Sequence, residues 1–457
     1  MDAVLTELLH DRVAAMNEQP VVESRDFVLL WLQGQRRIRE NVAFAHAQRR
    51  ANELRKPLVV YEGLRRDYPH ASARFHRFIL DGAADNARDC AEQGVAYAFF
   101  LETPKTPRGV LHALAARAAL VVTDFLPTFI HPGQTRRLAQ RASCRVEAVD
   151  AAGSVPLSTF PAAQIGARTV RPRLWKAVVL KHVPEVPARV KPPARFDWGF
   201  DPLRAPWEDV SGVPAHPAPV AGVRGGRAAG LLRLRAFLKD KLHGYAANRN
   251  EPASGSSSWM SPWLHFGFVG ATEIALAVRA AGAPKEDEES YLEELLVRRE
   301  LALNFCARVR NYGSIEALPP WAQKTLAAHA GDPRPHVSLD DLEQARSPDP
   351  VWNASQRQLL EEGRIHGYLR MLWGKNLLVW SKDAKEALQR MALLNDRYAL
   401  DGRDANSWAG FQWCLGMHDR PFPERSVFGV VRSMTSASAR RKLDLEPYLV
   451  RFGGSKR

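Results

Sequence analysis

Short apolar runs alternate with amphipathic stretches in the first third of the chain, and this alternation limits the folds open to it. The apolar runs are expected to form buried strands at residues 27–32, 57–61, 95–101 and 120–123, with a weaker fifth run at 144–149. Amphipathic helices are expected between them, at residues 38–54 and 71–93. Strands that alternate with helices form βαβ units and a parallel sheet. We therefore predict an α/β domain over residues 1–182.

The pattern changes at residue 183. Nine prolines stand between Pro184 and Pro219, and few periodic segments survive there, which predicts a linker over residues 183–225. After Gly226, apolar residues recur at spacings of three and four along residues 231–242, 271–280, 290–309, 355–381 and 384–394. We see no convincing strand in this part, so residues 226–457 are expected to form an all-α domain.

Two kinds of binding site are not supported by the sequence. No G-x-G-x-x-G motif follows the first expected strand, so ordinary dinucleotide binding is not indicated there. The four cysteines lie far apart and form no C-x-x-C pair, so we expect buried free thiols and no metal site.

The charge of the chain favours a polyanionic partner. Lysine and arginine number 64 against 50 acidic residues, a formal net charge of +14. Nucleic acid is the commonest partner of such a chain, although a surplus of positive charge also aids solubility. The N-terminal 19 residues carry charges throughout and no apolar run is long enough to span a bilayer, so we expect a cytoplasmic protein without a membrane partner.

Several motifs after residue 240 carry functional side chains. SSSWMSPWLHFG (256–267) combines hydroxyl groups with a helix start, an arrangement that binds phosphate or simply caps a helix. EELLVRRE (293–300) is either a salt-bridged helix face or the wall of a pocket. GYLRMLWGK (367–375) contains Trp373, seven residues before Trp380. Because seven residues advance a helix by roughly 10 Å on nearly the same face, the two rings suit a core stripe or an electron relay that Trp352 would complete.

These motifs and their order resemble the class II cyclobutane pyrimidine dimer photolyases. The resemblance also includes EELLVRRELALNF (293–305), RIHGYLRMLWGKNLLVW (364–380), LNDRYALDGRDANSW (394–408), WAQKTL (321–326), DPVWNA (349–354) and HDRP (418–421). Near the N-terminus, residues 27–47 and 51–64 fit the opening strand, helix and second strand of that family. The resemblance spans about residues 27–450 and implies a Rossmann-like antenna domain followed by an all-helical FAD-binding domain.

By this resemblance the helical domain binds FAD in a bent conformation. The matching positions are Tyr245, Ser257, Ser258, Met260, Ser261, Arg370, Asn395, Asp401 and Asn406. Arg370 and Asp401 would form an ion pair beside the flavin ring, which could also be purely structural. Asn395 would lie near the reactive edge of the ring.

The resemblance also implies an electron relay and a lesion pocket. The relay runs from Trp373, nearest the flavin, through Trp352 to Trp380 toward the surface. Glu294 is the best match to the glutamate that hydrogen-bonds the damaged bases, and Glu293 is a poorer match. Three further residues would face the lesion, namely Tyr368, Met371 and Trp413. Repair then needs one electron from reduced, photoexcited FAD, so the protein supplies orientation and a dry cavity.

The expected function is therefore light-driven repair of damaged double-stranded DNA by a monomeric flavoenzyme. A second antenna chromophore of unknown identity is expected in the α/β domain. The alternatives are a cryptochrome-like photoreceptor and a DNA-binding protein without catalysis; the residues that face the lesion argue against the first. A (6-4) photoproduct enzyme is disfavoured because no histidine pair is seen at the lesion. Ser433 and Thr435 stand where we expect a tyrosine and an asparagine from the family. We expect these two differences to alter the binding of the DNA strand opposite the lesion.

Overall fold

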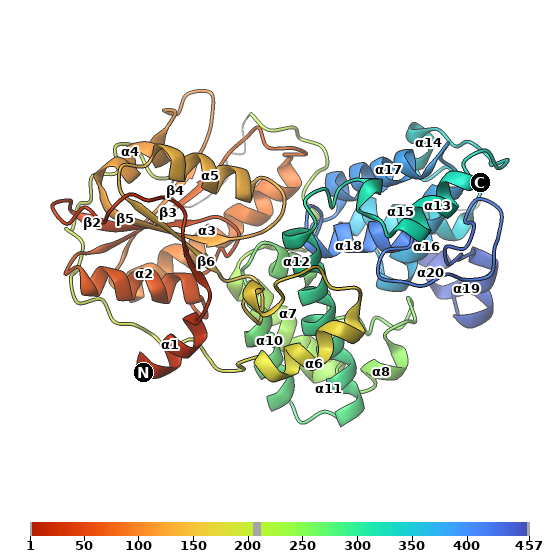
Figure 1. Cartoon of the computed structure of the whole chain (residues 1–457), viewed down its shortest axis with the longest axis horizontal. Coiled ribbons are helices and arrows are strands. Elements are labelled where there is room, and N and C mark those ends of the chain that lie inside the picture. Colours follow the sequence, from red (N-terminus) through yellow and green to blue (C-terminus); the bar gives the residue numbers. More distant parts are fainter. Residues whose placement is uncertain (1, 204–211, 455–457) are drawn as a thin grey trace. The chain divides into compact units, whose positions relative to one another are not determined.

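A six-stranded sheet forms the centre of the first of two compact units in the computed structural model, which describes residues 2–203 and 212–454 (Figure 1). This unit contains the chain up to Thr159 together with Lys176–Leu234 and Met260–Ala280, and the second unit contains Phe160–Trp175, Arg235–Trp259 and the chain from Ala281 on. Both units use segments from more than one predicted domain. The predicted boundaries at residues 182 and 226 stay a prediction.

The sheet has the order β1-β6-β5-β2-β3-β4. The strands are β1 (Val13–Ala15), β2 (Phe27–Leu32), β3 (Leu58–Leu64), β4 (Ala96–Leu101), β5 (Ala118–Phe125) and β6 (Arg145–Asp150). β2 to β6 pair in parallel, whereas β1 pairs antiparallel with β6. The predicted parallel α/β sheet is therefore confirmed, except for β1, which the sequence analysis missed. That strand has only three residues, all exposed, so it is too short to show the apolar run that marks a buried strand.

Successive residues of the central strand face opposite sides of the sheet. Val28, Leu30 and Leu32 of β2 pack in one apolar cluster, and Phe27 and Leu29 pack in the other. The first cluster also receives residues of α1 (Asp2–Leu9), α2 (Val42–Glu53) and α3 (Ala73–Glu92), and the second receives residues of α4 (Val110–Arg117) and α5 (His131–Arg141). The sheet is thus covered by helices on both faces, which explains why its strands are apolar throughout.

The loop after β2 is closed by a carboxylate. The backbone N–H groups of Gln33, Gly34 and Gln35 all donate to the side chain of Asp124, over 2.7 to 3.0 Å. In a dinucleotide-binding fold, the N–H groups at this place bind the pyrophosphate. Because Asp124 occupies them here, the structure gives a physical reason for the missing glycine motif.

The proline-rich segment packs on the first unit although it has no helix or strand at residues 183–203 and 212–225. The ring of Phe196 lies 5.1 Å from that of Phe27, and the ring of Phe200 lies 5.1 Å from that of Phe100. Residues 204–211 of the predicted linker lie outside the described residues. The described part of the segment is therefore ordered by aromatic contacts with the sheet domain.

The helices follow the expected periodicity after residue 226. They are α7 (Arg227–Asp240), α8 (Tyr245–Asn248), α9 (Ser261–His265), α10 (Ala271–Ala280), α11 (Lys285–Leu292), α12 (Arg299–Arg308), α13 (Pro320–Ala328), α14 (Leu339–Glu343), α15 (Pro350–Glu362), α16 (Gly367–Val379), α17 (Ala384–Tyr398), α18 (Ala405–Cys414), α19 (Ser436–Lys442) and α20 (Glu446–Phe452), after α6 (Ala167–Ala177) earlier in the chain. Short 3₁₀ turns occur at Leu157–Thr159 and Ile315–Ala317. The expected combination of an α/β part and a helical part is confirmed.

One expected helix is wrong. The pattern over residues 355–381 predicts a single helix, but the structure divides it into α15 and α16. Gly363 ends α15 in the left-handed conformation, with φ of 64°, and its N–H donates to the carbonyl of Leu359. A glycine adopts this conformation without strain, so it stops the helix although the apolar spacing continues.

A π-helical turn, η2 (Glu293–Arg298), joins α11 to α12. The expected helix over residues 290–309 is therefore continuous, but its middle is wound more loosely than an α-helix. Such turns are rare in proteins, and those that are found frequently lie at functional sites. This turn carries both Glu293 and Glu294.

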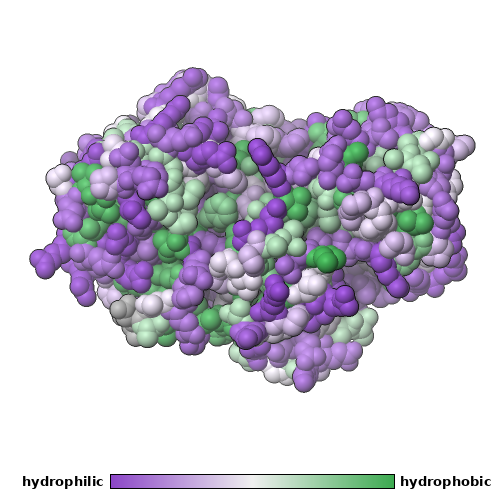
Figure 2. All heavy atoms as spheres, viewed as in Figure 1, coloured by the Kyte–Doolittle hydropathy of each residue, from purple (hydrophilic) through white to green (hydrophobic). Residues whose placement is uncertain are grey.

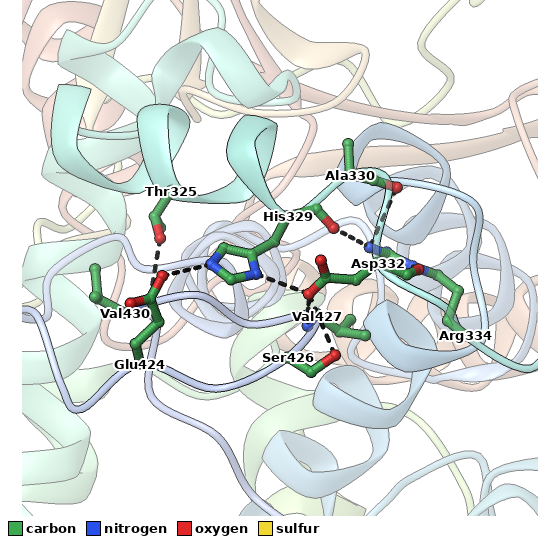
Figure 3. A network of polar contacts seen from close by, with 9 residues as sticks. All are labelled: Thr325, His329, Ala330, Asp332, Arg334, Glu424, Ser426, Val427 and Val430. Atoms are coloured by element: carbon green, nitrogen blue, oxygen red, sulfur yellow. Dashed lines mark hydrogen bonds and ion pairs between the residues drawn. The ribbon is translucent and has the colours of Figure 1, made fainter.

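The segment after α18 is attached to the end of α13 by a histidine between two carboxylates (Figure 3). His329 Nδ1 lies 2.7 Å from Asp332 Oδ2, and its Nε2 lies 2.8 Å from Glu424 Oε1. Asp332 and Glu424 raise the pKa of His329, because both ring nitrogens meet a carboxylate. Asp332 also accepts the backbone N–H of Val427 at 2.7 Å. This network fixes the turn that contains residues 424–430.

The visible surface is mostly hydrophilic. On the face that Figure 2 shows, hydrophilic residues cover most of the area and apolar residues occur in small groups. No helix of the described residues is long and apolar enough to cross a membrane.

Candidate active site

A buried ion pair links α16 to the turn after α17. Arg370 Nη2 lies 3.1 and 3.0 Å from the two carboxylate oxygens of Asp401. The two side chains are 18% and 8% exposed, so the pair is mostly removed from water. The structure therefore brings together the two residues that the sequence analysis paired.

Two nitrogen atoms at the start of α16, one of them on its N-cap residue, have no hydrogen-bond partner within the described residues. They are Nε of Arg370 and Nδ1 of His366, both buried. His366 precedes Arg370 by four residues, which places the two side chains on one face. Burial lowers the pKa of His366 to about 4, so its ring is neutral near pH 7. Buried polar atoms without a partner are rare in proteins, and these two suit a polar ligand such as FAD beside the ion pair.

Asn395 belongs to the same buried network. Its Nδ2 donates to Ser407 Oγ at 3.2 Å, and Ser407 Oγ donates to the carbonyl of Asp401 at 3.1 Å. Ser407, at the start of α18, was missed by the sequence analysis although it stands within the NSW part of a quoted motif. Three of the expected FAD residues, Arg370, Asn395 and Asp401, are thus connected.

Asn406 lies apart from this network. Its side chain is exposed, and its Nδ2 and backbone N–H both donate to Asp404 Oδ1 at 2.9 Å. Asp404 is the N-cap of α18, so this contact stabilises the start of the helix.

The expected hydroxyl cluster forms around two tyrosines. Tyr291 donates its hydroxyl to Ser258 Oγ at 3.1 Å, and its ring lies 5.2 Å from that of Tyr245. Burial raises the pKa of Tyr245 to about 12, so its phenol stays protonated. Ser257 is half-buried beside Ser258 in the second unit. The expected residues Met260 and Ser261 belong to the first unit, with the former buried and the latter exposed.

Three tryptophans form a continuous stack. The rings of Trp373 and Trp352 are parallel within 2°, with centroids 6.1 Å apart, and Trp380 meets Trp352 edge to face at 5.2 Å. The indole N–H of Trp352 donates to the carbonyl of Trp373 at 3.0 Å, and that of Trp373 donates to Gln356 Oε1 at 2.9 Å. Trp352 therefore lies between Trp373 of α16 and Trp380, the C-cap of that helix, in the order that the resemblance implies. Trp380 is 4% exposed, against 0% for Trp352 and 1% for Trp373, and the expected direction of the relay toward the surface stays a prediction.

The two glutamates of η2 have different partners. Glu293 accepts two hydrogen bonds from Arg171, at 2.8 and 3.0 Å, and lies 3.2 Å from Arg298. Glu294 pairs with Arg249 at 2.8 Å and is 41% exposed. Glu293 thus has the contacts of a structural ion pair, whereas Glu294 is the more accessible carboxylate.

The three residues expected to face the lesion come from two packed helices. Tyr368 and Met371 stand on α16, and Trp413 stands on α18; all three are partly buried against the core of the second unit. Gly410 of α18 lies against Met371 of α16, since a Cβ atom at Gly410 would be 3.4 Å from the terminal methyl group of Met371.

The departures from the family lie after this region. Thr435 is the N-cap of α19, where its hydroxyl accepts the N–H of Ser438 at 3.1 Å. Threonine is also a preferred N-cap residue, although a weaker one than asparagine, so the helix start is preserved. Ser433 is partly exposed and shows no contact that explains its identity.

Relatives with curated names match almost the whole chain. The deoxyribodipyrimidine photo-lyase of Methanothermobacter thermautotrophicus is 35% identical over 454 residues, which cover 97% of this chain and 98% of that protein. The chain belongs to the deoxyribodipyrimidine photo-lyase family. The photo-lyase of Potorous tridactylus is 34% identical and covers 93% of this chain and 81% of its own length. No protein-family model matches the chain.

Solved structures show the same fold. A class III photolyase of Agrobacterium tumefaciens superposes with a TM-score of 0.68 at 18% identity, covering 94% of this chain and 86% of its own. A cryptochrome of Synechocystis superposes with a TM-score of 0.70 at 14% identity, covering 93% and 88%. A photolyase of Sulfolobus tokodaii is described with two FAD molecules, with the implication of a novel light-harvesting cofactor. It superposes with a TM-score of 0.68 at 14% identity, covering 93% of this chain and 90% of its own.

Membership of this family confirms the enzyme expected from the motifs. The chain is a photolyase, a carbon–carbon lyase and flavoprotein that repairs DNA with light, and the family implies FAD as its cofactor. The roles of the individual site residues remain predictions.

We expect Asp401→Asn to destabilise the protein by about 3 kcal/mol, near the lower end of the range for buried pairs, because Arg370 keeps some contact with water. Urea unfolding of the full chain, followed by tryptophan fluorescence, measures this cost. The matched control is Asp341→Asn, which removes an exposed carboxylate from Arg346 and should change stability little. Equal costs for the two variants would show that the Arg370–Asp401 pair contributes no more than a surface pair.

Proposed function

We propose that this photolyase is a class II enzyme that repairs cyclobutane pyrimidine dimers in double-stranded DNA. The observation that supports it best is the tryptophan stack beside the buried ion pair. Trp373 follows Arg370 by three residues, so the first ring of the stack and the pair with Asp401 share one face of α16. A cofactor held at this face would lie next to the stack.

We assign FAD binding to the second unit. Arg370 and Asp401 supply a fixed positive and negative group, Asn395 supplies a neutral amide, and His366 supplies a neutral ring nitrogen. We further assign cofactor contacts in this unit to Tyr245, Ser257, Ser258 and Asn406. Met260 and Ser261, which the resemblance also matches, belong to the first unit and stay predictions from the sequence. When it is bound and has absorbed light, reduced FAD supplies the electron that splits the cyclobutane ring.

The protein contributes orientation, exclusion of water and a path for electrons. Trp373, Trp352 and Trp380 have ring centroids no more than 6.1 Å apart along the stack, so an electron can pass between neighbours in short steps. Trp352 and Trp373 are fully buried, which keeps water from the inner two positions. This relay would restore the reduced cofactor, a task separate from repair.

The lesion is assigned to the α16–α18 face and to η2. Tyr368, Met371 and Trp413 offer aromatic and apolar surface against which a flipped base pair can stack. Glu294 would hydrogen-bond the bases, and Arg249 holds its carboxylate at 2.8 Å. The net charge of +14 suits contacts with phosphates of the duplex.

We also propose that the protein acts as a monomer. In the first unit it would bind a second, light-harvesting chromophore, and we leave the chemical class of this chromophore open.

We expect Trp373→Phe to block photoreduction of oxidised FAD, because phenylalanine is much harder to oxidise than tryptophan. Repair by chemically reduced enzyme should be largely intact, since it needs no electron from the stack. The absorption spectrum under blue light measures photoreduction of the FAD, and a repair assay measures the activity of the chemically reduced enzyme. Trp408→Phe is a matched control because Trp408 lies outside the stack, next to Tyr312 and Phe411. Normal photoreduction in the Trp373 variant would contradict the relay.

We expect Glu294→Ala to lower the quantum yield of repair more than it weakens binding to a duplex with one thymine dimer. The carboxylate would contact the bases, whereas the phosphate contacts that dominate affinity are unchanged. Both quantities are measured on the same oligonucleotide.

The neighbouring Glu293→Ala variant is the control. It removes the partner of Arg171 and should affect stability rather than quantum yield. If Glu293→Ala shows the loss of quantum yield and Glu294→Ala does not, the assignment of the lesion-binding carboxylate is wrong. If neither variant shows it, η2 is a structural element held by ion pairs.

A further inference from the structure

A lysine is completely buried beneath one wall of the proposed lesion site. Lys375 has 0% exposure, and its Nζ donates to the carbonyl of Cys414 at 2.7 Å. Within the described residues it forms no ion pair, although lysine is almost never fully buried without one. Its Nζ also lies 5.0 Å from the centre of the Trp413 ring, within the range of a cation–π contact.

The position of Lys375 on α16 connects it to the lesion-facing residues. Tyr368, Met371 and Lys375 are spaced by three and four residues, so they share one face of the helix. Arg370 and Trp373 lie on the opposite face, which carries the ion pair and the stack. The helix thus separates the proposed cofactor side from the proposed lesion side, and Lys375 belongs to the second.

The groups around Lys375 come from α16, α18 and the segment after α18. Burial lowers the pKa of Lys375 to about 8; Cys414 and Asp419 act in the opposite direction, and Arg432 adds to the effect of burial. Arg432 also lies over Trp413, at 5.7 Å, but it is paired with Asp419 at 3.0 Å and is 42% exposed. Burial raises the pKa of the Cys414 thiol to about 11, so it does not titrate near pH 8.

We propose that Lys375 is a positioning residue for lesion recognition, which holds Trp413 by its positive charge in the orientation against which the damaged bases stack. This inference rests on the proposed function. The ammonium group attracts the face of the indole ring and, through the carbonyl of Cys414, fixes the end of α18 that carries Trp413. A neutral amine could still donate to Cys414, but it would lose the attraction to the ring.

The pH dependence separates this role from a merely structural one. Between the folded-state pKa of about 8 and the ordinary value of 10.5, the unfolded chain keeps the proton that the folded chain has lost. The unfolded state then binds more protons, so this group makes the protein more stable as the pH rises. Recognition should change in the opposite direction, because the charge that holds Trp413 disappears.

The experiment measures, in the dark, the affinity of the FAD-loaded full chain for a duplex with one thymine dimer and for the undamaged duplex. The preference for the damaged duplex should fall roughly fivefold between pH 7 and pH 9, the size of a partly buried cation–π contact. Lys375→Met should show the reduced preference already at pH 7 and no further fall to pH 9. The control Lys382→Met removes the same charge from an exposed site and should behave as wild type.

Two comparisons test the mechanism. In a Trp413→Leu background, Lys375→Met should cause no further loss, because the two residues act through one contact. Urea unfolding of the wild type at pH 7 and pH 9 needs no variant and should show no loss of stability that could account for the weaker preference.

The outcomes distinguish the inference from the proposed function. A preference for the damaged duplex that is the same at pH 7 and pH 9, or an undiminished effect of Lys375→Met in the Trp413→Leu background, would overturn the role of Lys375 alone. Absence of any preference at pH 7 in the wild type would instead overturn the proposed function.

Discussion

The ion pair between Arg370 and Asp401 is the constraint on which the proposed active site depends. It joins α16 to the turn between α17 and α18, and through Ser407 it is connected to Asn395. Breaking a buried pair by removing one partner is costly because it leaves a charge without compensation. The pair therefore fixes the register of three helices at the place where a cofactor must be held.

Helix α16 carries two functions on opposite faces. Arg370 and Trp373 occupy one face, and Tyr368, Met371 and Lys375 occupy the other. An electron relay and a lesion wall have different requirements, since the first needs closely packed aromatic rings and the second needs exposed surface. Placing both on one rigid helix keeps their distance constant without a hinge.

Much of this arrangement could be predicted from the sequence, and the exceptions have physical causes. β2 was predicted at its observed residues because a strand buried on both faces is apolar throughout. The break at Gly363 was missed because apolar spacing continues across it, and only the glycine signals the end of α15. Lys375 and Ser407 were missed because their importance comes from partners that are 39 and 12 residues away.

The central claim is that this chain uses light to split pyrimidine dimers. The most direct measurement is the number of dimers that the reduced, FAD-loaded protein removes from an oligonucleotide under blue light and in the dark. The account predicts repair in the light, with return of the pyrimidine absorbance, and none in the dark. Full FAD occupancy and selective binding of the damaged duplex without any repair in the light would contradict it, and would indicate a photoreceptor on the same fold.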